Sequence, residues 1–229
     1  MRDQQTSRFF QGARAVSPIL VGVIPFGLIF GVTASAANVS SWAAWASSFI
    51  IFAGAAQLAV VDILGSGGTA AVAILTAVVI NARHLMYSAD LGRYTGSESM
   101  RSKISMAYVL TDQAFLVWKQ EFPDTGATTG YRSYYFGGAL TLWTTWQIST
   151  SAGFVLGAAI PASWSLEFAI PLTFLALLVL AVRDKPGLVA AAAGGAVALA
   201  AVSMPYNLGL IMGAIAGVGA GITSERWLT

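Results

Sequence analysis

The sequence predicts an all-α integral membrane protein with about seven or eight membrane segments. Hydrophobic residues make up 56% of its 229 residues and charged residues only 10%, against roughly 25% charged residues in an average soluble domain. The mean hydropathy is +0.71. Polar stretches between the apolar segments are no longer than loops. We therefore expect one membrane domain over residues 1–229, without a separate soluble domain.

Eight apolar segments follow one another along the chain, and most approach the 20 or so residues that cross a hydrocarbon core as a helix. They cover residues 15–37, 42–64, 69–91, 104–120, 134–160, 167–182, 187–203 and 207–223. The first follows three arginines and ends in Ala34-Ser35-Ala36, as a cleavable signal would. It is too long for a signal, and proline and glycine interrupt it, so we expect it to be part of the membrane domain.

Two topologies fit the distribution of lysine and arginine, and both begin with a cytoplasmic N-terminus. If all eight segments cross, most basic residues lie inside, but the loop 93–103 violates the positive-inside rule. In the alternative, Pro18 and Pro25 break the first segment, which enters the membrane without crossing it. This second topology places the 93–103 loop inside.

A faint internal repeat favours the second topology. Phe10-Gln11-Gly12-Ala13 resembles Phe136-Gly137-Gly138-Ala139, and Gly27 and Gly31 recur as Gly153 and Gly157 at the same offset. If the chain is a tandem of two related halves, 10–120 and 134–223, the halves have inverted topology, which is common in secondary transporters. Chance recurrence of glycine in membrane helices is the alternative.

The segment 69–91 carries polar side chains that are costly at membrane depth and therefore indicate a functional site. These are Asn81, Arg83, His84 and Tyr87, with Asp90 at the end. On one continuous helix, Asn81, His84 and Tyr87 share a face. The alternative is that Arg83 and Asp90 reach a helix end and Tyr87 lies at the interface, although Asn81 and His84 are too short to do so.

Three other segments also carry candidate residues. Pro25-Phe26-Gly27 predicts a kinked or discontinuous helix whose exposed ends can bind a solute, unless it is an ordinary kink with Gly27 and Gly31 used for packing. Gln57 places an amide in an apolar segment, where an interhelical hydrogen bond is the alternative. Asp112, followed by Gln113, is either paired, as with Arg83, or protonated, and the two states could couple transport to protons.

The last segment has glycine at every fourth position, which exposes backbone along one helix face and predicts close packing with another helix or a partner subunit. These residues are Gly209, Gly213, Gly217 and Gly221. No cysteine and a single histidine argue against a disulfide framework, a thiolate site or a protein-built metal centre. We find no Ser/His/Asp set and no P-loop, so we expect no enzyme, no cofactor and no nucleic-acid partner.

In this order, four elements of the chain resemble the AzlC family, the large subunits of bacterial branched-chain amino acid exporters. The elements are Pro25-Phe26-Gly27, Phe52-Ala53-Gly54-Ala55-Ala56-Gln57, Asn81-Ala82-Arg83-His84-Leu85-Met86-Tyr87 and Thr111-Asp112. The resemblance is clear over residues 10–120 and otherwise limited to hydropathy. It implies an inner-membrane secondary transporter that exports valine, leucine, isoleucine or methionine together with a small hydrophobic AzlD-type subunit.

The resemblance also marks individual positions, which fall on Pro25, Gly27, Gln57, Asn81, Arg83, His84 and Asp112. The family usually has an acidic residue where this chain has Gln113, which argues against a two-carboxylate proton relay and favours Asp112 or His84. We expect Arg83 or a helix end to hold the substrate carboxylate, Asn81 and Gln57 to hydrogen-bond, and Phe26 to line the side-chain pocket. The main alternative is a channel-like or structural subunit whose polar cluster only packs helices or lines water.

Overall fold

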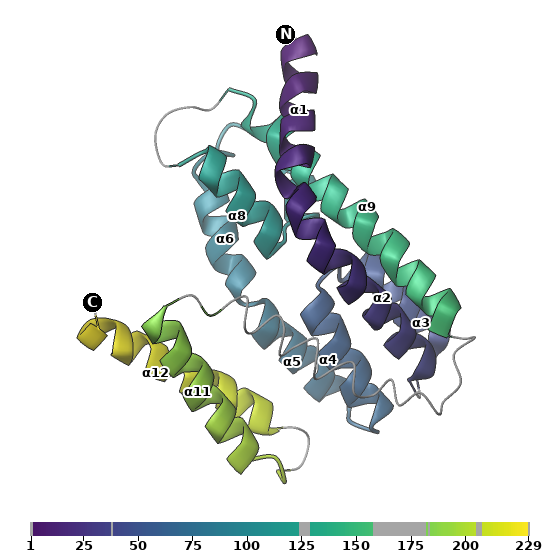
Figure 1. Ribbon diagram of the computed structural model, residues 1–229, viewed down its shortest axis with the longest axis vertical. Coiled ribbons are helices and arrows are strands. Elements are labelled where there is room, and N and C mark those ends of the chain that lie inside the picture. The colour runs from purple at the N-terminus through teal and green to yellow at the C-terminus, as the bar shows by residue number, and fades with distance from the viewer. Residues whose placement is uncertain are drawn as a thin grey trace.

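The computed structural model describes residues 2–37, 39–123, 129–157, 182, 184–204 and 208–228. These residues form helices, turns and irregular backbone without a β-strand, which confirms the all-α class (Figure 1). In chain order the helices are α1 (Arg2–Val16), the 3-10 turn η1 (Ser17–Ile19), α2 (Leu20–Ala36), α3 (Ser41–Ile50), α4 (Gly54–Gly65), α5 (Ala70–Asn81), α6 (Arg83–Gly92), α7 (Met100–Tyr108), α8 (Asp112–Glu121), α9 (Tyr131–Gly157), α11 (Lys185–Ala200) and α12 (Leu208–Leu228).

The first apolar segment is part of one long helical rod. Helices α1 and α2 are joined by the single turn η1 at Pro18, and Gln5–Ala36 forms a 32-residue candidate membrane span. Pro25 lies inside α2 without ending it, so the predicted break at Pro25 is wrong. Proline removes a helical hydrogen bond and costs about 3 kcal/mol in a helix interior. We attribute the continuity of the rod to its packing along a second long helix.

That second helix is α9, which runs parallel to the rod in close backbone contact (Figure 1). A Cβ atom added at Gly12 would overlap the carbonyl of Tyr134, and one at Gly31 would overlap the backbone of Thr150. From α9, Gly153 meets Leu28 in the same way. The glycines of the predicted repeat thus face each other in one interface. Their helices run in the same direction, whereas inverted halves predict opposite directions for these two segments.

The next three predicted segments each divide into two helices. Segment 42–64 is interrupted between α3 and α4, segment 69–91 bends by 45° between α5 and α6, and segment 104–120 is interrupted between α7 and α8. The expectation that Asn81, His84 and Tyr87 lie on one continuous helix is wrong. The breaks fall at the same polar motifs that the sequence analysis singled out.

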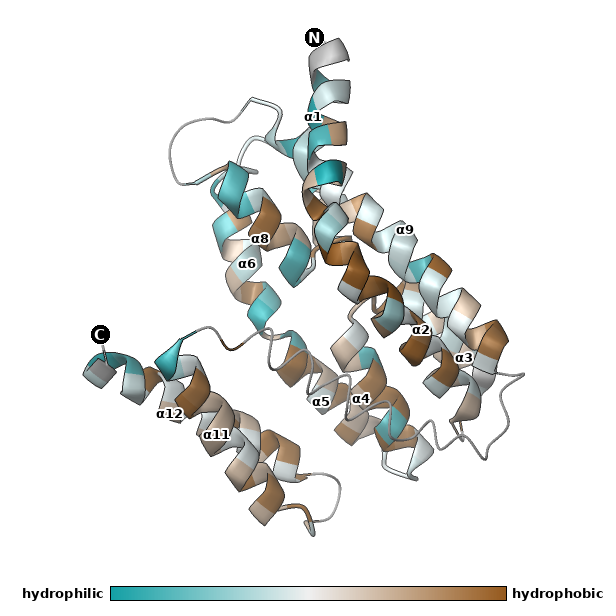
Figure 2. Ribbon diagram, viewed as in Figure 1, coloured by the Kyte–Doolittle hydropathy of each residue, from teal (hydrophilic) through white to brown (hydrophobic). Residues whose placement is uncertain are grey.

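Two clusters of buried side chains surround these breaks. One joins α6, α7, α8 and α9 around Trp118 and Tyr135, which are each 1% exposed. The other joins α2, α3, α4 and α9 around Phe30, Leu58 and Trp146. Apolar residues cover α2, α4 and α5, whereas polar residues gather on α1 and along α6 and α8 (Figure 2). The second break therefore lies between an apolar helix, α5, and a more polar one, α6.

Helices α11 and α12 form an antiparallel hairpin near α5 (Figure 1). The four glycines at every fourth position of α12 face α11: Gly209 meets Ala201, Gly213 meets Gly194 and Ala198, and Gly217 and Gly221 meet Ala190. The glycine face is thus occupied within the chain. The predicted segment 167–182 lies, except for Val182, outside the described residues.

By length and composition, two helices of the described residues can cross a membrane, Gln5–Ala36 and Leu208–Trp227. The bent pair α5 and α6 makes a third if the two form one span. The exact number of seven or eight segments stays a prediction, as do the single domain over residues 1–229 and its two halves.

We expect Gly213→Leu to destabilise the α11–α12 hairpin by about 1–3 kcal/mol, because a Cβ atom there lies 2.8 Å from the carbonyl oxygen of Gly194. Thermal unfolding of the purified protein in detergent measures the change. Gly219→Leu is the matched control, since no atom lies within 4 Å of a Cβ at that position. Equal melting temperatures for the two variants would contradict the packing role of Gly213.

Candidate functional site

The first break, between α3 and α4, is held by the buried side chain of Gln57. Its Oε1 accepts a hydrogen bond of 3.0 Å from the backbone N–H of Ala53, and its Nε2 donates to the hydroxyls of Ser47 and Ser48 at 3.1 and 3.2 Å. Phe52 has φ +43°, a left-handed conformation that costs an ordinary residue about 1–2 kcal/mol. Gln57 therefore fixes a strained break by satisfying groups on both sides of it.

The second break lies at Ala82, between α5 and α6. The backbone N–H groups of Ala82 and Leu85 bond to carbonyls three residues earlier, Val79 and Ala82, instead of four. The ring Nδ1 of His84 lies 3.1 Å from the carbonyl oxygen of Asn81. Asn81 therefore ends one helix and His84 belongs to the next, so they do not share one continuous helix face. They still meet, because the side chain of His84 reaches back across the break.

The third break separates α7 from α8. The hydroxyl of Thr111 accepts a hydrogen bond of 3.2 Å from the backbone N–H of Ala114, which is an N-cap at the start of α8. Asp112 is the first residue of that helix, where the positive end of the helix dipole stabilises its charge. Its Oδ2 accepts from the guanidinium of Arg83 at 2.8 Å. This ion pair joins the starts of α6 and α8.

Residues from all three breaks line one small cavity of about 170 Å³. The lining consists of Ile51, Phe52 and Ala53 from the first break, Asn81 and His84 from the second, and Ala107, Tyr108 and Leu110 from the third. Helices α4, α6 and α8 begin at these breaks, and α3, α5 and α7 end there. Both the positive and the negative ends of helix dipoles therefore gather around this cavity, which we call the break cavity.

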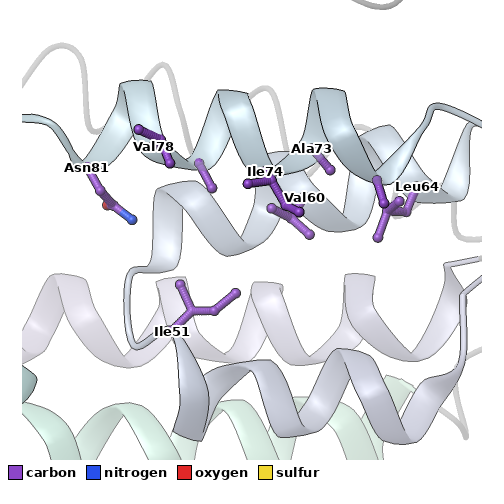
Figure 3. Close-up of a pocket in the computed structure, with 9 residues that line it drawn as sticks. Ile51, Val60, Leu64, Ala73, Ile74, Val78 and Asn81 are labelled. Carbon is purple, nitrogen blue, oxygen red and sulfur yellow. The ribbon is translucent and has the colours of Figure 1, made fainter.

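A second, apolar cavity of about 320 Å³ adjoins the break cavity and shares Ile51 and Asn81 with it. It lies between α4 and α5, with Asn81 at one end and Leu64 at the other (Figure 3). The rest of its lining is aliphatic: Val60, Ala70, Ala73, Ile74, Ala77 and Val78. We call it the α4–α5 cavity.

The contact between His84 and Asn81 indicates the tautomer of the His84 ring. A carbonyl oxygen only accepts hydrogen bonds, so Nδ1 carries the proton that it donates to Asn81. In the neutral ring the other nitrogen, Nε2, is then an acceptor. His84 thus brings a ring with one donor and one acceptor to the lining of the break cavity.

Helices α6 and α8 run parallel and are joined at three successive levels. The Arg83–Asp112 pair comes first, Tyr87 stacks on Phe115 at 4.5 Å, and Asp90 pairs with Lys119 at 2.8 Å. On α6, Arg83 and Asp90 lie seven residues apart, which is two helical turns, and so do Asp112 and Lys119 on α8. The basic residue belongs to α6 in the first pair and to α8 in the second. The two helices therefore form one unit that starts at the break cavity.

Two polar atoms at the site are buried without a hydrogen-bond partner among the described residues, Asn81 Oδ1 and Asp112 Oδ1. An unpaired buried polar group costs about 1–3 kcal/mol, so each of these atoms is available to a further hydrogen-bond partner. Asn81 Oδ1 belongs to a residue that lines both cavities, so it is the polar group at their junction.

The AzlC protein family model matches residues 18–160, which contain all three breaks and the whole of α9. The chain belongs to the AzlC family. It is similar to the inner membrane protein YgaZ of Escherichia coli K12, with 26% identity over 92% of this chain and 89% of that protein. It is also 28% identical, over 93% of this chain and 94% of the other, to an uncharacterized membrane protein of Archaeoglobus fulgidus. No solved structure matches it.

The AzlC resemblance and the composition marked ten site residues, which the structure places in three groups. Asn81 and His84 line the break cavity. Arg83, Asp112 and Tyr87 form a layer beside it, with the ring of Tyr87 edge-on to His84 at 5.8 Å, and Gln113 follows in the first turn of α8. Gln57, Pro25, Phe26 and Gly27 lie elsewhere.

The expectation that Phe26 lines a side-chain pocket is not met by either cavity. Phe26 packs edge-on against Trp146 at 5.3 Å and close to Gly54, at the start of α4. Gly27 packs against Ser149 of α9, and Pro25 is exposed. Phe26 and Gly27 therefore pack α2 against α9 and the start of α4, next to the first break that the hydrogen bonds of Gln57 hold.

Sequence reasoning missed two features of the site. Tyr108 lines the break cavity and donates a hydrogen bond of 2.6 Å to the carbonyl oxygen of Phe49, across to α3. Ser47 and Ser48, the partners of Gln57, end up at the first break. Two adjacent hydroxyls in an apolar segment, about ten residues before a buried amide, were the available signal.

We expect the Arg83–Asp112 pair to couple the stability of α6 to that of α8. Arg83→Gln, Asp112→Asn and the double variant form a double-mutant cycle, and the coupling free energy should exceed about 0.5 kcal/mol because the two side chains touch. Thermal or denaturant unfolding in detergent measures it. Strictly additive effects would mean that the pair does not hold the two helices together.

Proposed function

We propose that this AzlC-family membrane protein is a secondary transporter that exports small apolar amino acids, the branched-chain ones first. The observation that supports this most is the convergence of three helix breaks on one cavity. Breaks at membrane depth are tolerated only where protein or water covers them, and transporters use such breaks to bind solutes.

The groups around the break cavity suit a zwitterion. The N-terminal ends of α4, α6 and α8 offer positive potential and N–H groups to a carboxylate. Asn81 Oδ1 and the carbonyl end of α5 offer acceptors to an ammonium group. Arg83 is held by Asp112, so in this proposal a helix end, rather than Arg83, binds the carboxylate.

The AzlC resemblance supports valine, leucine, isoleucine or methionine as substrates and a small AzlD-type subunit as a partner. The names of the two relatives specify only an inner membrane protein and a membrane protein. We extend that location to this chain, with a cytoplasmic N-terminus.

We further propose that transport is coupled to protons through His84 and Asp112. His84 lines the cavity, and histidine is the side chain whose charge change falls closest to physiological pH in general. Asp112 links this site to Arg83, and protonation of its carboxylate would release the guanidinium. Proton uptake would thus alter both the cavity and the α6–α8 unit.

The decisive experiment is counterflow in liposomes that contain the protein alone or with its partner subunit. Vesicles preloaded with unlabelled valine should take up labelled valine transiently and saturably. Uptake that rises linearly with concentration, without counterflow, would instead support the channel-like alternative. Asn81→Leu, which removes the polar group at the junction of the cavities, should lower transport at least ten-fold at normal abundance.

Proton coupling makes a separate prediction. Inverted vesicles with an acidic interior should accumulate valine, because protons leaving down their gradient drive substrate in. His84→Gln or Asp112→Asn should abolish accumulation but retain valine–valine exchange, since exchange moves no net proton. Accumulation that survives a proton ionophore but stops when sodium is removed would contradict the assignment of the coupling ion.

A further inference from the structure

We propose that the α4–α5 cavity is the subsite for the substrate's side chain and that Ala77 limits the length of chain it accepts. The inference rests on the proposed function, since it requires that an amino acid binds in the break cavity. It assigns substrate selectivity to aliphatic residues of α5 that precede the polar motif in sequence.

The two cavities are joined at Asn81 and Ile51, which line both. A zwitterionic group held by the helix ends and by Asn81 Oδ1 would have its Cα at this junction. The apolar space between α4 and α5 adjoins the break cavity at these two residues (Figure 3). An aliphatic side chain therefore gains its burial by extending along α5, away from Asn81.

The distance of a residue from Asn81 along α5 determines which substrate side chains are long enough to contact it. Ala77 precedes Asn81 by four residues, about 6 Å along the helix axis, whereas Ala70 lies more than 15 Å away by the same rise of about 1.5 Å per residue. The terminal methyls of leucine or methionine would come into van der Waals contact at the level of Ala77, and the side chain of alanine would not. Ala70, at the opposite end near Leu64, lies beyond any of these side chains.

The occupant competing for this cavity is a lipid acyl chain, because Ile74 and Val78 at its edge are 65% and 61% exposed. An acyl chain would fill the aliphatic part but leave Asn81 Oδ1 unpaired. An amino acid satisfies both the polar junction and the aliphatic lining, and on this basis we assign the cavity to it.

The test compares the kcat/KM of alanine, valine, leucine and methionine transport in liposomes. Ala77→Leu should lower the leucine-to-alanine and methionine-to-alanine ratios about ten-fold or more, the discrimination that a difference of one or two methylenes supports. Ala77→Gly should raise the methionine-to-valine ratio. A control variant on the same helix, Ala71→Leu outside the cavity lining, should leave all ratios unchanged.

Each outcome is informative. A wild-type protein that transports none of the four amino acids overturns the proposed function itself. Normal wild-type transport with unchanged ratios in both Ala77 variants overturns only the subsite and indicates a lipid chain in the cavity. Should Ala77→Leu fail to accumulate in membranes, the ratio measured with Ala77→Gly decides, because that variant only removes a methyl group.

Discussion

Every backbone N–H and C=O group buried away from water must find a hydrogen-bond partner, and the three helix breaks make this requirement hard to meet. The chain meets it with short-range substitutes: Gln57 at the first break, bonds to the third residue back at Ala82, and the hydroxyl of Thr111 at the third. Because the three breaks lie next to one another around one cavity, the same part of the protein surrounds all of them. At the junction of the two cavities, Asn81 Oδ1 remains without a hydrogen-bond partner among the described residues, and the proposed function assigns it to the solute.

The long rod of α1 and α2 with α9 provides the rigid support that such breaks require. Its glycines let the backbones touch, so the pair cannot slide without overlap at positions such as Gly31 and Gly153. Trp146 projects from this pair against Phe26 and the start of α4. Gln147, the next residue, donates a hydrogen bond of 3.0 Å to the carbonyl oxygen of Ser48. Trp146 and Gln147 of α9 therefore support the first break.

The sequence predicted the all-α membrane class, the polar cluster and the family, because hydropathy and residue type are local properties. It misplaced the helix breaks. Proline at position 25 suggested a break where tertiary packing keeps the helix continuous, whereas Phe52, Ala82 and Leu110 carry no breaking signal and yet lie at interruptions. Local substitutes satisfy their backbone groups, but contacts from other helices cover them: Tyr108 of α7 donates to the carbonyl oxygen of Phe49, and Gln147 of α9 donates to that of Ser48. The convergence of the breaks on one cavity was equally inaccessible to local reasoning.

The break cavity lies between two helix pairs of different character. The α6–α8 pair carries ion pairs at both ends and an aromatic stack between them, so charge changes at Asp112 act on the pair as a whole. The α4–α5 pair presents an aliphatic wall, whose shape depends on side-chain volume and not on pH. In the proposed mechanism, proton coupling and substrate selectivity therefore belong to different helices that meet at Asn81 and His84. A substitution in one pair can then alter its property without abolishing the other, which is the physical reason for treating coupling and selectivity as separable.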